Sequence, residues 1–157
     1  MRKIASLLLT AILLATMLSV SSVPASASEY TKHITDDTVL AGQTLRVLER
    51  RTYGNLTVNG ELLVKSMGIV IADEICVNST GKLTLEPGAT IVTKELTLSC
   101  KNTVIPAGTT VIAESIVYLK QNAELLLESG AKLNSPEING DNGTKLTVSA
   151  GATVLTE

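Results

Sequence analysis

Residues 83–91 read LTLEPGATI, and residues 125–133 read LLLESGAKL. Both stretches place two apolar residues around a central residue, then an acidic residue, a turn with glycine and a new apolar position. Related segments begin at Leu62, Val104 and Leu146, so the five copies start at 62, 83, 104, 125 and 146. The starts are evenly spaced, with a step of 21 each time. A fixed step over this many copies indicates a repeat architecture built from stacked structural units.

Each repeat contains three short segments with the alternation of a half-buried strand. The first segment leads into a corner with the pattern glycine, small, polar, apolar, and a third apolar segment follows the corner. The corner glycines are Gly88, Gly108, Gly130 and Gly151, and Met67 occupies the same slot in an earlier copy. Outside the N-terminal apolar run, no stretch shows helical periodicity over ten or more residues. We therefore expect three strands per repeat and essentially no helix.

Three strands per copy and a constant step favour a parallel solenoid over an antiparallel sandwich, because a solenoid stacks each residue on its equivalent in the next coil. We predict an all-β fold, a single-stranded parallel β-helix with triangular coils of about 21 residues and right-handed crossovers. About five coils fit into the chain. The interior would hold a ladder of stacked side chains: Leu62, Leu83, Val104, Leu125 and Leu146.

The spacing of the corner glycines varies, from 20 to 22 and then to 21, whereas the ladder keeps its step. Loops at the corners should therefore absorb single insertions and deletions, because a strand that slipped by one residue would turn its apolar side chains outward.

The N-terminal segment, residues 1–27, has the features of a secretory signal peptide. Arg2 and Lys3 precede an apolar run, and Ala25 and Ala27 form a small-residue cleavage site. We expect residues 1–27 to be removed, residues 28–41 to form an N-terminal cap segment and residues 42–157 to form the solenoid domain. The predicted location is secreted or at the cell surface, without a membrane span after cleavage.

Composition removes several classes of function. The formal net charge is −2, and it becomes more negative without the leader, which argues against nucleic acid as a partner. The chain has no Trp, no Phe and three Tyr, so an aromatic platform for bases or sugars has little to be built from. The single His, His33, excludes a metal site with several histidines and leaves little material for a Ser-His-Asp triad.

The repeats at 83–91 and 125–133 resemble those of parallel β-helix proteins of the bacterial surface, of the adhesin-like type. They are more loosely similar to the bactofilin-like solenoids that form polymers. The resemblance covers about residues 42–155. It implies the fold, and no functional residue is transferred from it. Bactofilins are cytoplasmic, and the signal peptide departs from that pattern.

Four glutamates fall near one corner of successive coils and would form an acidic row that binds Ca²⁺ through carboxylates about 5 Å apart. The alternative interpretation is a solvated edge whose charges prevent aggregation. The four residues are Glu74, Glu95, Glu114 and Glu137.

The two cysteines would lie on neighbouring coils. Cys76 should point outward, and Cys100 lies three residues beyond the position that stacks on it. The Cα atoms would be roughly 11 Å apart, beyond the ~7 Å that a disulfide allows, so only a bulge at the corner would let them pair.

We expect a non-enzymatic structural or binding module that associates with itself, or with another surface protein, through strand edges. The last fragment, with Gly151 and Val154, would supply that edge. The alternative is a carbohydrate-binding or carbohydrate-active module that uses the acidic row, with Ca²⁺ as its only candidate cofactor. Polysaccharide lyases and hydrolases resemble this chain in fold alone, because they need more coils and a cluster of acidic and basic residues on one face.

Overall fold

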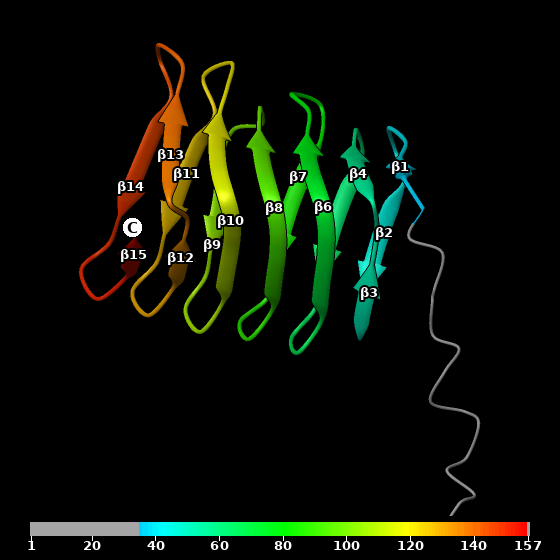
Figure 1. Cartoon of the computed structure of the whole chain (residues 1–157), viewed down its shortest axis with the longest axis horizontal. Helices are drawn as coiled ribbons and strands as arrows, with labels where there is room; N and C mark the ends of the chain where they lie inside the picture. The colour runs from blue at the N-terminus through cyan, green and yellow to red at the C-terminus, as the bar shows by residue number, and fades with distance from the viewer. Residues whose placement is uncertain (1–34, 157) are drawn as a thin grey trace, which may run out of the picture. The chain divides into compact units, whose positions relative to one another are not determined.

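The computed structural model describes residues 35–156, which form fifteen β-strands and no helix. Every strand pair is parallel, and the strands are organised in a nine-stranded and a six-stranded sheet (Figure 1). The chain is an all-β parallel solenoid with about 21 residues per turn, which confirms the predicted fold. It has about six turns where about five were expected, since strand pairing already begins at Asp37.

Three strand segments make up each turn, and equivalent segments of successive turns stack into three faces. Face A contains β1 (Asp37–Val39), β4 (Asn55–Val58), the second halves of β6 (Ile69–Val77), β8 (Thr90–Leu98) and β10 (Thr110–Leu119), and β13 (Glu137–Gly140). Face B contains β2 (Thr44–Val47), β5 (Glu61–Val64), β7 (Lys82–Leu85), β9 (Thr103–Ile105), β11 (Glu124–Leu127) and β14 (Lys145–Val148). Face C contains β3 (Arg50–Thr52), the first halves of β6, β8 and β10, then β12 (Lys132–Asn134) and β15 (Thr153–Leu155).

The first of these strands falls within the segment that was expected to be a cap, residues 28–41. β1 pairs with β4 through Val39 and Val58, so residues 37–39 are part of the first turn. The predicted signal peptide, residues 1–27, lies outside the described residues. Within residues 35–156 no helix could span a membrane.

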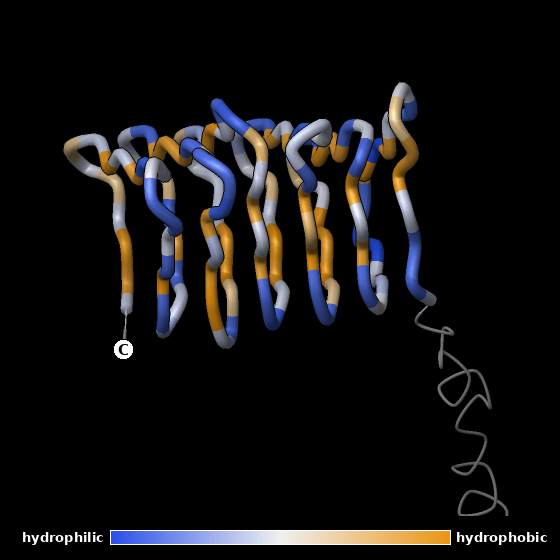
Figure 2. Tube along the Cα trace, turned by 90° about the horizontal axis from the view of Figure 1, so that it is seen from above, coloured by the Kyte–Doolittle hydropathy of each residue, from blue (hydrophilic) through white to orange (hydrophobic). Residues whose placement is uncertain are grey.

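Alternation along each strand sends every second side chain into the interior. In β7, Leu83 and Leu85 are buried while Lys82 is exposed. Figure 2 shows the same pattern for the solenoid, with hydrophobic residues along the strands and hydrophilic residues concentrated in many of the turns. Burying such a side chain contributes about 1.5–3 kcal/mol, so the stacked interior is the main source of stability.

One inner row keeps the constant step of the repeat, but it lies on face A. Ile75 pairs with Leu96, Leu96 with Val117, and Val117 with Ile138. The first three of these side chains are fully buried. Residues at an invariant step therefore do stack directly over one another, as the repeat predicted.

On face B the predicted inner row is wrong at Val104. Val104 pairs with Thr84 and Leu126, which are outer positions, and its side chain is only half-buried. Thr103 takes the inner position instead: it pairs with Leu125 and is 2% exposed. The inner row is thus Leu45, Leu62, Leu83, Thr103, Leu125 and Leu146.

A one-residue deletion in the fourth turn explains the difference. Four residues separate Leu98 from Thr103, whereas five separate Val77 from Leu83. An extra residue between Ala113 and Ile116, where the register shifts, restores the alignment. The lost residue and the extra residue cancel within one turn, as expected. The strands of this turn on faces B and C lie between the two sites, so their residues are shifted by one position from the constant step.

Exchanging these neighbours for aspartate tests the corrected register. Thr103→Asp places a charge in the interior and should cost more than about 3 kcal/mol of unfolding free energy, or prevent folding. Val104→Asp faces outward and should cost about 1 kcal/mol or less. Urea denaturation followed by circular dichroism measures both, and the reverse ranking would restore Val104 to the interior.

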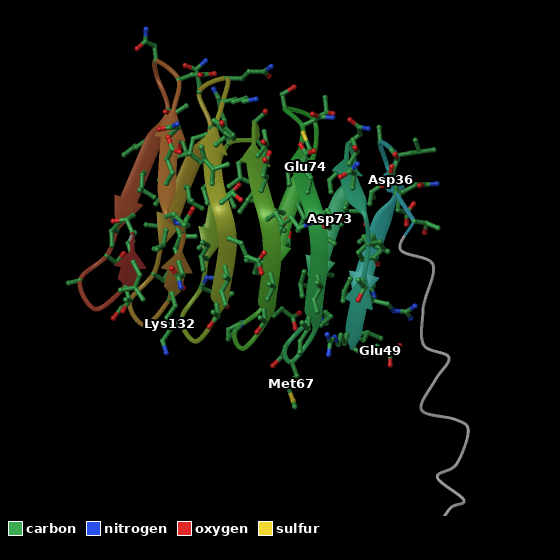
Figure 3. The ribbon with its side chains drawn as sticks, in the orientation of Figure 1. Asp36, Glu49, Met67, Asp73, Glu74 and Lys132 are labelled. Carbon is green, nitrogen blue, oxygen red and sulfur yellow. The ribbon has the colours of Figure 1, made fainter. Side chains whose placement is uncertain are left out.

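The corner between faces B and C needs a left-handed residue in most turns. Gly88, Gly108, Gly130 and Gly151 have φ between 74° and 86°, and Met67 has φ 65° in the same slot. A non-glycine residue there costs roughly 1–2 kcal/mol because its Cβ crowds the following carbonyl oxygen. The Met67 side chain is 81% exposed and extends away from the turn (Figure 3), so packing of this side chain offsets little of the conformational cost.

Met67→Gly should therefore stabilise the protein, by about 0.5–1 kcal/mol after the greater entropy of glycine in the unfolded chain is subtracted. The neighbouring Ser66→Gly is the matched control, because Ser66 is exposed but has no positive φ, and it should destabilise slightly. A Met67→Gly midpoint in urea below that of the wild type would contradict the assignment of strain.

Candidate functional site

The four glutamates of the predicted acidic row do not form one continuous row. Glu74 and Glu95 are register partners on β6 and β8. The next position of that row is Ile116, which is buried, and Glu137 pairs with Ile116 on its other side. Glu114 lies in the bulge of β10. Within residues 35–156, no group of three or more His, Cys, Asp or Glu is arranged to hold a metal ion.

The bend between faces C and A carries alternating charges. Lys94 forms an ion pair with Asp73, which raises the pKa of Lys94, and Glu114 adds a smaller effect in the same direction. A hollow of about 150 Å³ lies beside them, lined by these residues and by Tyr53, whose pKa is raised mainly by burial. Ligand pockets measure about 300–1,000 Å³, so this hollow is small for a sugar ring.

The two cysteines are both free thiols in the structure. Cys76 is half-buried on face A, and burial, with Glu74 nearby, raises its pKa. Cys100 is buried in the shortened corner of the fourth turn, with its Sγ 3.1 Å from Thr103 Oγ1. Cys100 therefore fills the interior at the deletion and satisfies the buried hydroxyl that replaces a leucine.

Ion pairs on the outer surface connect neighbouring turns. Glu61 contacts Lys82 at 3.1 Å and accepts a hydrogen bond from Thr84, which lowers the pKa of Glu61. Glu86 accepts hydrogen bonds from the Lys65 ammonium and from the backbone N–H of Ser66, and these hold the pKa of Glu86 below its ordinary value of 4.5. Both carboxylates thus stabilise the stacking of turns while they are ionised.

Because the pKa of Glu86 is lower in the folded protein, its contribution is present above pH 4.5 and is lost as the pH falls through the folded pKa. Urea denaturation at pH 6 and pH 3 should show a drop in stability that is smaller in Glu86→Gln. Glu128 occupies the equivalent corner and forms no ion pair within the described part of the chain. The loss of stability between pH 6 and pH 3 should therefore be larger in Glu128→Gln than in Glu86→Gln. Equal losses in the two variants would show that the contact with Lys65 does not contribute to stability.

The last turn leaves inner positions uncovered. Leu146 and Val148 continue the inner positions of face B, and they are 37% and 46% exposed, whereas Leu125 and Leu127 one turn earlier are 1% and 0% exposed. Ile138 and Val154, the inner residues of β13 and β15, are partly exposed. Together Ile138, Leu146, Val148 and Val154 make an apolar surface, which we call the C-terminal end surface.

The same turn has open strand edges. β13, β14 and β15 pair with β10, β11 and β12 on one side, and no described strand pairs with their other side. An edge of this kind presents N–H and C=O groups that accept another strand. Of the two residues predicted to form a self-association edge, Val154 lies on β15, whose far side pairs with no described strand, and Gly151 forms the preceding turn. The Gly151 carbonyl accepts a hydrogen bond from the N–H of Gly130.

The first turn has a different character. Asp37 pairs with Leu56 and Arg51 pairs with Val70, so charged residues occupy inner register positions there. Asp36 and Glu49 lie at the same end of the solenoid (Figure 3). The charged residues are visible in the sequence, but only the strand register shows that Asp37 and Arg51 continue the inner rows.

Comparison with protein-family models, with curated proteins and with solved structures gave no match.

Proposed function

We propose that the chain is an exported, non-enzymatic structural module that associates with itself end to end through the C-terminal end surface. The observation that carries the proposal is the exposure of Leu146 and Val148, whose equivalents one turn earlier are fully covered. Each turn of a solenoid buries the inner side chains of the turn before it, and within residues 35–156 no turn stacks on the far side of β13, β14 and β15.

Association would stabilise this turn in two ways. It would remove the apolar side chains from water, at about 25 cal/mol per Å² of buried apolar surface. It would also give hydrogen-bond partners to the free edges of β13, β14 and β15. A strand edge and an apolar surface in the same place favour addition of further β-structure rather than binding of a small molecule.

The resemblance of the repeats to adhesin-like and bactofilin-like solenoids supports a structural role, and the signal-peptide pattern of residues 1–27 supports a location outside the cytoplasm. In this role the solenoid is a short stiff rod, because each turn is fixed to its neighbours by strand pairing on three faces.

Val148→Asp tests the role of the end surface. The mature protein should sediment with a mass that rises with concentration, and Val148→Asp should shift it to the monomer, because the carboxylate would lose its hydration in the contact. Val104→Asp is the matched control, since it makes the same change on an outer position of face B in the middle of the rod. It should associate like the wild type.

Circular dichroism of both variants establishes that the fold is retained. A wild-type protein that stays monomeric at every concentration in analytical ultracentrifugation contradicts the proposed function. If Val148→Asp associates like the wild type, the contact does not involve the C-terminal end surface.

A further inference from the structure

We infer that self-association produces a closed, two-fold dimer in which two copies meet through their C-terminal end surfaces, rather than an open head-to-tail polymer. The inference rests on the proposed function, because it specifies which surfaces meet when the solenoids join end to end. Both ends expose apolar side chains, Leu40 and Leu48 in the first turn and Leu146 and Val148 in the last. They differ in the residues at the inner register positions, which include charged side chains in the first turn only, and this difference decides between the two arrangements.

The first turn is unsuited to cover the last turn of another copy. Its inner register positions include Asp37 and Arg51, both of them exposed. Asp37 accepts a hydrogen bond from the N–H of Thr38, and Arg51 forms an ion pair with Glu49. Inward-register charges on an edge strand are a known means by which β-proteins prevent edge-to-edge association.

Head-to-tail stacking would place each strand of the last turn on the equivalent strand of the first turn. On face A, Ile138 would then lie over Asp37, and Glu137 would lie over Asp36. On face C, Val154 would lie over Arg51. Only face B matches, with Leu146 over Leu45 and Val148 over Val47. Two apolar residues would thus lose water against charges, and two acidic groups would be brought together.

A second C-terminal end surface is a better cover. A two-fold axis that passes through Leu146, perpendicular to the solenoid axis, lays β14 antiparallel to its own copy and β13 antiparallel to β15 of the other copy. Leu146 then faces Leu146, and Ile138 faces Val154, so inner residues meet inner residues.

The outer positions tolerate this arrangement as well. In the same register Lys145 faces Thr147, Glu137 faces Leu155, and Asn139 faces Thr153, so no two like charges oppose each other. An isologous contact uses the same surface on both copies, so the assembly is complete with two copies. The charged first turns would then lie at the two outer ends of the dimer.

Site-specific cross-linking distinguishes the two arrangements. We would replace Cys76 by Ser and Cys100 by Ala, confirm by sedimentation that this background associates like the wild type, and add Thr147→Cys or Arg46→Cys. These residues are outer positions of face B in the last and first turns. A short bifunctional maleimide then joins cysteines that lie close together.

The two-fold dimer predicts that Thr147→Cys alone cross-links to a dimer, because both copies of the residue lie near the axis. Head-to-tail stacking separates these two cysteines by about 29 Å, six strand spacings of ~4.8 Å. It predicts instead a product that joins the two variants in an equimolar mixture, which mass spectrometry of tagged variants identifies. That mixed product, without the Thr147→Cys dimer, overturns the inference.

Sedimentation of the unmodified protein gives an independent answer if the cysteine variants fold poorly. A mass that saturates at two copies supports the two-fold dimer. A continuing series of larger species overturns it and leaves the proposed function standing. A monomer at all concentrations, as expected if the end surface serves a strand from a different protein, overturns both.

Discussion

Every feature of this protein depends on one constraint: a residue in one turn must stack on its equivalent in the next, at a strand spacing of ~4.8 Å. Because side chains alternate between the two sides of a strand, a slip of one residue would exchange the interior and the surface of a whole strand. The fourth turn shows how strictly the constraint holds. It loses a residue in one corner and regains one at the bulge between Ala113 and Ile116, so that face A remains in register.

Much of this arrangement can be predicted from the amino-acid sequence, because the constraint leaves a periodic trace. The constant step, the corner glycines and the short alternating segments give the strands, the parallel stacking and the lack of helix in the described residues. The error at Val104 has a physical cause. Thr103 and Val104 both suit a strand, and a constant step hides a deletion that is balanced elsewhere in the turn. Only the pairing of Thr103 with Leu125 shows which one lies inside.

The candidate site was predicted less well, because its properties depend on what lies next to a residue rather than on the residue itself. Leu125 and Leu146 occupy the same place in the repeat, yet one is 1% exposed and the other 37%. The predicted acidic row is interrupted for a related reason: the bulge in β10 brings Ile116, not Glu114, into line with Glu95. A sequence pattern identifies equivalent positions but does not report local shifts of register or missing neighbours.

The uniformity of the turns also separates the length of the solenoid from the chemistry of its ends. An additional copy of the repeat, inserted between two middle turns, would meet the same two kinds of neighbour as the turns around it, and it would lengthen the solenoid by about 4.8 Å. Asp37 and Arg51 at one end, and Leu146 and Val148 at the other, would be unaffected. Duplication of a repeat within the gene would thus change the length of the solenoid in steps of one turn and leave the residues at both ends unchanged.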